Sequence, residues 1–159
     1  MGLDMYVIKR KKGQKVDEGA FDEVLYWRKA NAIHKWFVDN VQDGTDDCRY
    51  YAVTKEQITE LKNICQEVLD KVITVEGKVE NGKSYKPETG WVTNYEDGLI
   101  ITNPEVAEEL LPTTSGFFFG STNYDSWYLE DLKETVKKIE GLLETFDFEN
   151  DYLVYTSSW

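Results

Sequence analysis

Residues 54–72 constrain the fold most, because they combine the start signal of a helix with a long periodic apolar face. Thr54 is followed three positions later by Gln57, the spacing of a capping box, in which free N–H groups at a helix start are satisfied reciprocally. The apolar side chains that follow share one helical face: Ile58, Leu61, Cys65, Val68 and Val72. Such a stripe must be buried, so the segment predicts a helix packed on a second layer.

Two further helices are predicted from similar signals. Asn103 and Pro104 suit the cap and first position of a short helix, which Pro112 ends. Asp125 or Asn123 is expected to cap a long C-terminal helix. The apolar stripe of that helix consists of Leu129, Leu132, Val136, Ile139, Leu143 and Phe146.

Residues 21–41 are also predicted as a helix, with two rows of side chains. The apolar row is Tyr26, Ala30, Ile33, Phe37 and Val41, at spacings of three and four. A second row lies about 100° around the helix. It consists of Trp27, Asn31, His34 and Val38.

Four stretches are predicted as strands. Residues 3–9 alternate and are apolar on both faces, as in a central strand. Residues 48–53 form a short strand, and residues 116–120 a short buried strand with the first and third of its three phenylalanines on one face. Residues 151–159 alternate to the end of the chain, and we expect them to pair with the first strand.

Between residues 75 and 102 the pattern changes to turns and short strands. Asn81-Gly82 and Asp97-Gly98 are both hairpin signals. They separate four short strands, near 75–80, 83–86, 91–95 and 99–102. We therefore expect a small hairpin-rich meander beside the main sheet.

These elements predict an α+β fold in which residues 1–159 form a single domain. The hydrophobic fraction of 41% is that of a globular chain, and no linker or repeat interrupts it. We expect a mostly antiparallel sheet with two or three longer helices on one face and the meander to the side.

The charge of the chain is strongly acidic and unevenly placed. Residues 1–15 carry +4, so the remainder must carry −16 for the total to be −12. Like charge disfavours direct binding to nucleic acid or to an anionic membrane, and favours a partner protein with a basic surface. The alternative is that the charge serves only solubility.

Several signals indicate the cytoplasm. No apolar run approaches the roughly 18 residues of a membrane span, and the first bases follow the apolar start, which is the reverse of a secretory signal. The two cysteines, Cys48 and Cys65, have no CxxC spacing, so both are expected as reduced thiols.

The first half of a candidate ligand site is the row that carries Trp27, Arg28, Asn31 and His34. Arg28 can bind an anion by charge-assisted hydrogen bonds, and Trp27 can stack on a planar group. His34 is the only histidine, and it is a possible general base if an orienting carboxylate lies nearby. The alternative is a structural histidine at the edge of the core.

The second half is the turn after the triple phenylalanine, whose candidate residues are Ser121, Thr122, Tyr124 and Asp125. Backbone N–H groups at a helix start can bind an anion, so a nucleotide-like ligand is the natural candidate. The site exists only if this turn and the Trp27–His34 row meet. The alternative is ordinary turn and capping chemistry.

Motifs for catalysis, metal ions or cofactors are missing from the sequence. The chain has no HExxH, EF-hand loop, P-loop or GxSxG, and no Cys/His cluster. We therefore expect no cofactor and no metal, and an enzyme is the less favoured class.

Five segments together resemble a family of small, functionally uncharacterised proteins of bacteriophages and prophages of Gram-positive bacteria. They are MGLDMY, YWRKANAIHKWF, ENGK, NPEVAEELLP and SGFFFGSTNYDSWYLEDL. The resemblance implies an accessory protein acting in the host cytoplasm. By analogy, it implies a protein that binds a host macromolecule through its acidic surface and inhibits a defence or nucleic-acid enzyme. The alternatives are a binder of small nucleotide-like anions and an enzyme that uses His34 as base.

Overall fold

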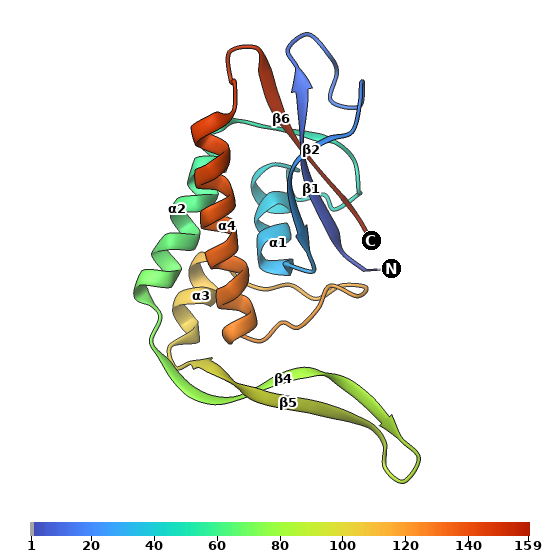
Figure 1. Cartoon of the computed structure of the whole chain (residues 1–159), viewed down its shortest axis with the longest axis vertical. Coiled ribbons are helices and arrows are strands. Elements are labelled where there is room, and N and C mark those ends of the chain that lie inside the picture. The colour runs from blue at the N-terminus through green and yellow to red at the C-terminus, as the bar shows by residue number, and fades with distance from the viewer. Residues whose placement is uncertain (1) are drawn as a thin grey trace.

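A four-stranded antiparallel sheet holds the two ends of the chain side by side (Figure 1). It is seen in a computed structural model that describes residues 2–159. The strand order is β2 (Asp22–Arg28), β1 (Asp4–Lys11), β6 (Asp151–Ser158) and β3 (Tyr51–Val53). The pairing of the first and last strands is confirmed, since β1 and β6 pair from Asp4↔Ser158 to Lys11↔Asp151.

The central strand β1 is buried on both faces, as its sequence predicts. Leu3, Met5 and Val7 face the helices and enter the main core. On the other face Ile8 is fully buried and Arg10 nearly so. That face is covered by the loop between β1 and β2, where the Arg10 guanidinium donates to the backbone oxygens of Val16 and Ala20.

The helices are α1 (Asn31–Asn40), α2 (Lys55–Lys71), α3 (Pro104–Leu110) and α4 (Ser126–Thr145). Helix α2 packs along α4, which in turn contacts α1 and β2, so the predicted α+β architecture is confirmed (Figure 1). The capping box is also present: Thr54 Oγ1 accepts from Gln57 N at 3.0 Å, and Thr54 N donates to Gln57 Oε1 at 2.9 Å. No helix within residues 2–159 combines the length and apolar character that crossing a membrane requires.

The predicted helix over residues 21–41 is wrong in its first half, which forms strand β2. Leu25 and Trp27 are buried while their neighbours on the other face are not, and this is the period of a strand. Pairing with β1 decides between the two periods, because the spacing of the apolar side chains fits both. Lys29 has a left-handed backbone with φ of 55°, and it separates β2 from α1.

The predicted buried strand at residues 116–120 is also wrong. Phe117 and Phe118 are 60% and 52% exposed, and only Phe119 is buried. Phe118 and Gly120 have left-handed backbones, with φ of 55° and 88°, so the segment turns and does not extend. Its backbone is held by the start of the chain, since Leu3 N donates to Phe118 O.

The predicted meander is one long two-stranded ribbon, formed by β4 (Thr74–Lys86) and β5 (Gly90–Ile101). The Asn81-Gly82 pair lies in a bulge of β4, and Asp97-Gly98 lies within β5, so neither pair makes a hairpin turn. Figure 1 shows the distal part of this β4–β5 ribbon standing away from the helices. In the middle of the ribbon, where Glu80 pairs with Tyr95, Trp127 Nε1 of α4 donates to Glu80 O at 3.0 Å.

Gly98 is required where the ribbon meets α4. A Cβ at this position would lie 2.6 Å from Ser126 Oγ and 2.8 Å from Val79 Cγ2. We therefore expect Gly98→Ala to lower the free energy of unfolding by about 1–3 kcal/mol, measured by urea denaturation. Gly141→Ala is the control, because a Cβ there meets nothing within 4 Å, and it should stabilise α4 by about 0.5–1 kcal/mol. Equal effects of the two changes would contradict this packing.

Leu132 tests the inward face of α4, since its side chain is fully buried in the main core. Leu132→Asp should lower the free energy of unfolding by about 3–5 kcal/mol, because it buries a charge without a partner. The neighbouring exposed position gives the control: Lys133→Asp should change stability by no more than about 0.5 kcal/mol. A near-neutral Leu132→Asp variant would overturn the register of α4.

Candidate functional site

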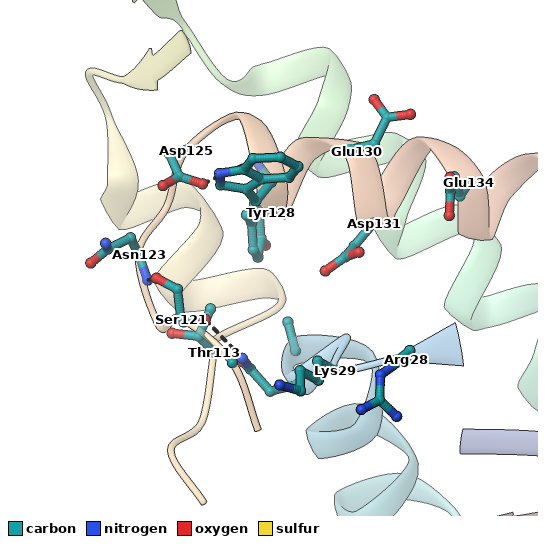
Figure 2. A pocket seen from close by; sticks show the side chains of 14 residues that line it. Arg28, Lys29, Thr113, Ser121, Asn123, Asp125, Tyr128, Glu130, Asp131 and Glu134 are labelled. Carbon is teal, nitrogen blue, oxygen red and sulfur yellow. Dashed lines mark hydrogen bonds between the residues drawn. The ribbon is translucent and has the colours of Figure 1, made fainter. Parts of the chain in front are cut away.

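A cavity of about 430 Å³ lies between the end of β2, the start of α1, the turn before α4 and the first turns of α4 (Figure 2). The volume is within the range of small-ligand sites. Of the residues predicted for a ligand site, the cavity brings together four: Arg28, Asn31, Ser121 and Asp125. The two predicted segments therefore do meet, although by fewer residues than expected.

Basic side chains from the end of β2 line one wall. Arg28 Nη1 donates to Asp4 Oδ1 at 2.8 Å, so its charge is largely matched by that carboxylate. Lys29 follows at the left-handed position, where its backbone N donates to Leu3 O at 2.8 Å. Its ammonium group makes no ion pair within 4.0 Å in the described part of the chain, residues 2–159.

Acidic side chains of α4 and its cap line the opposite wall: Asp125, Glu130, Asp131 and Glu134. Asp125 accepts from Trp127 N at 3.0 Å as the helix cap, while burial raises the pKa of this carboxyl. In Figure 2 the Asp131 carboxylate points into the cavity, whereas Glu130 points away from it. Cationic and anionic groups are thus separated on facing walls.

Asp131 is the carboxyl group of the cavity whose pKa is shifted most. Burial raises the pKa of its carboxyl to about 7, and the negative charges of Glu134 and Glu130 add to the effect, while Lys138 opposes it. Across residues 2–159 its carboxylate accepts no hydrogen bond and forms no ion pair within 4.0 Å. A partly buried carboxylate without a partner destabilises the fold, and such groups are concentrated at functional sites.

Asn31 shapes the cavity from below. Its Nδ2 donates to Phe119 O at 3.1 Å and to Ser121 O at 2.8 Å, and its Oδ1 accepts from Thr114 N at 3.1 Å. These bonds use the side chain fully, so Asn31 positions the turn that forms the wall. It is not left with a free group for a ligand.

Trp27, Thr122 and Tyr124 lie outside the cavity, against the prediction. Trp27 is in the core, where its Nε1 donates to Thr135 Oγ1 at 2.9 Å. Its position on β2, not on a helix, turns it away from Asn31. Thr122 and Tyr124 line a separate depression under the β4–β5 ribbon.

His34 also lies outside the cavity, sealed in the core with only 1% of its surface exposed. Its Nδ1 lies 2.6 Å from Tyr155 Oη, and its Nε2 lies 2.9 Å from Asp46 Oδ2. Burial lowers the pKa of the imidazole, although Asp46 opposes this. A substrate has no access to this ring, so the structure favours the structural alternative over a general base.

Sequence reasoning missed Lys29, Glu130, Asp131 and Glu134. The spacing of Asp131 and Glu134 was a usable signal, because side chains three positions apart are neighbours on one side of a helix. The cavity that they line was not visible, because its facing wall comes from β2, about 100 residues earlier. No group of three His, Cys, Asp or Glu side chains in residues 2–159 is arranged to hold a metal ion.

No protein-family model matches the chain, and neither a curated protein nor a solved structure does. The resemblance to bacteriophage proteins therefore stays a hypothesis from sequence motifs. The function is therefore inferred from the cavity and from the exposed side chains of the β4–β5 ribbon.

The raised pKa of Asp131 predicts a pH dependence of stability. The folded state keeps the proton up to about pH 7, whereas the unfolded chain loses it near the ordinary value of 3.8. Stability from this group is therefore greatest below pH 4, falls between pH 4 and 7, and is constant above. The Asp131→Asn variant has no carboxyl to ionise at this position, so its stability does not fall in this way. It should be more stable than the parent at pH 8.

We expect a gain of about 1–3 kcal/mol at pH 8, because solvent screens part of the roughly 4 kcal/mol that three pKa units represent. The gain should shrink towards zero at pH 4, as measured by urea denaturation of both proteins at each pH. Glu144→Gln, at an exposed position of the same helix, is the control and should show no such trend. A gain that does not vary with pH would contradict the assignment.

Proposed function

We propose that this protein is a non-catalytic binding protein whose β4–β5 ribbon docks on the basic surface of a partner protein. The resemblance to bacteriophage proteins supplies the context, in which the partner is a host protein, such as a defence or nucleic-acid enzyme that the binding inhibits. The observation that carries the proposal is a set of exposed aromatic side chains on the ribbon.

This aromatic face consists of Tyr85, Trp91 and Tyr95, which are 62%, 71% and 60% exposed. Tyr85 and Trp91 are cross-strand partners with ring centroids 5.7 Å apart. Trp91 and Tyr95 are four residues apart on β5, so they stand on the same side of the strand. Three large rings thus share one face of a projecting element.

Exposed rings on a projecting ribbon are unfavourable unless another surface covers them. A two-stranded hairpin is marginally stable alone in water, and the distal part of this ribbon stands away from the other elements described (Figure 1). Tryptophan and tyrosine are also the side chains most enriched at the energetic centres of interfaces. Both considerations favour an intermolecular contact.

The charge beside the aromatic face favours a basic partner. Tyr95 lines a depression together with Glu80, Glu108 and Asp125. Lys78, the only basic side chain lining it, pairs with Asp97. A lysine or arginine of the partner would meet both a ring face and carboxylates there. The net charge of −12 would attract such a partner and repel nucleic acid.

A photo-crosslinking residue tests the contact directly. We expect substitution of Trp91 with a benzophenone amino acid to give one dominant adduct with a second protein when the chain is expressed in a Gram-positive host. The same substitution at Phe21, an exposed ring away from the ribbon, is the control and should not give that adduct. Mass spectrometry identifies the partner. An adduct formed equally from both positions, or none from Trp91, would refute the proposal.

Affinity for the purified partner then separates the contribution of the aromatic rings from that of the carboxylates. Trp91→Ser with Tyr95→Ser should weaken binding at least about tenfold, which is roughly 1.4 kcal/mol. Glu80→Gln with Glu108→Gln should weaken it less and reduce its dependence on salt. An affinity that does not change with salt concentration would contradict the proposal of a basic partner.

A further inference from the structure

The cavity between β2 and α4 is separate from the aromatic face, and its charges define a ligand of their own. Two of its charged groups are matched internally: Arg28 by Asp4, and Asp125 by the N-terminus of α4. The groups left are one cation, Lys29, and two acids of α4, Glu130 and Asp131, because Glu134 Oε2 lies 3.9 Å from Lys138 Nζ. The lining therefore has one positive wall and a surplus of negative charge on the other.

We propose that this cavity binds a small basic amino acid, arginine or lysine, with its carboxylate at Lys29 and its cationic groups at the acidic wall. Such a ligand carries a carboxylate for the basic wall and cationic groups for the acidic wall, so it matches the lining in the sign of its charges. Asp131 is the central contact, because its carboxylate points into the cavity and has no partner within residues 2–159 (Figure 2). The proposal is independent of the ribbon contact.

The remaining walls fit the rest of the ligand. Trp127 lines the cavity and is 46% exposed, so its indole can pack on an alkyl chain or on a guanidinium plane. Tyr128 and Ala32 supply the apolar floor. The volume of about 430 Å³ accepts a single amino acid and leaves room for water.

The same lining argues against the nucleotide-like anion that the sequence suggested. A phosphate group would find one unmatched cation, Lys29, and would face the carboxylates of Asp131 and Glu134. Its repulsion from Asp131 and Glu134 would act across a partly desolvated space, where charges are poorly screened. The ligand must therefore carry positive charge.

The test is a titration of the isotope-labelled full chain with free L-arginine and L-lysine, followed by backbone amide shifts. We expect saturable shifts confined to residues 28–32 and 120–134, with a dissociation constant below about 1 mM. Agmatine, which lacks the carboxylate, and L-glutamate, which lacks the second cation, should each bind at least tenfold more weakly. A peptide ending in arginine distinguishes a chain end from the free amino acid as the natural form.

Two variants locate the ligand. Asp131→Asn and Lys29→Gln should each weaken L-arginine binding at least tenfold, while Lys133→Gln and Glu144→Gln leave it unchanged. Circular dichroism verifies that each variant is folded, and Lys29→Gln keeps the test decisive if Asp131→Asn alters the helix. The proposal is overturned by the absence of saturable shifts up to about 10 mM, by equal binding of agmatine, or by full affinity in both variants.

Discussion

The pairing of β1 with β6 is the contact on which the rest of the structure depends. It joins eight residue pairs from opposite ends of the chain, and it places β1 at the centre of the sheet between β2 and β6. Because the strands bury side chains on both faces, their alignment fixes which residues face the helices and which face the loop of Arg10. The chain between β1 and β6 must therefore begin and end at neighbouring strands of one sheet. Its helices pack on one face of that sheet (Figure 1).

One buried amide then determines where the cavity forms. Asn31 ties the start of α1 to the turn that precedes α4, through three backbone groups. This leaves α4 starting opposite the end of β2, with acids on one side and bases on the other. No side chain within residues 2–159 pairs with the Asp131 carboxylate, and its burial raises its pKa. A site that destabilises its own fold in this way is better explained by a ligand than by architecture.

The sequence predicted those features that local signals determine and missed those that depend on distant partners. The capping box at Thr54 is complete within four residues, and the alternation in β6 is visible in the strand itself. The apolar spacing in residues 21–41 suits a helix and a strand alike, and only pairing with β1 selects the strand. The hairpin signal at Asp97-Gly98 was misleading because Gly98 serves close packing on Ser126. Four of the eight residues predicted for a site line one cavity for the same reason: Arg28 ends β2 and Asp125 caps α4, whereas the direction of Trp27 depends on which element it occupies.

Acidic side chains gather at two places, beside Tyr95 on the ribbon and in the cavity between β2 and α4. The two environments differ, and each suits a different kind of binding partner. Around Tyr95 the carboxylates of Glu80 and Glu108 are exposed and lie beside an exposed ring, so they can meet a flexible basic side chain at little desolvation cost. In the cavity, Asp131 is already partly desolvated, and Lys29 lies on the opposite wall. That arrangement selects by size and by the order of charges along a molecule, which a flat acidic surface cannot do. The ribbon surface is therefore suited to a macromolecule and the cavity to a small zwitterion with excess positive charge. The two surfaces adjoin at the start of α4, because Asn123 and Asp125 line both the cavity and the depression beside Tyr95.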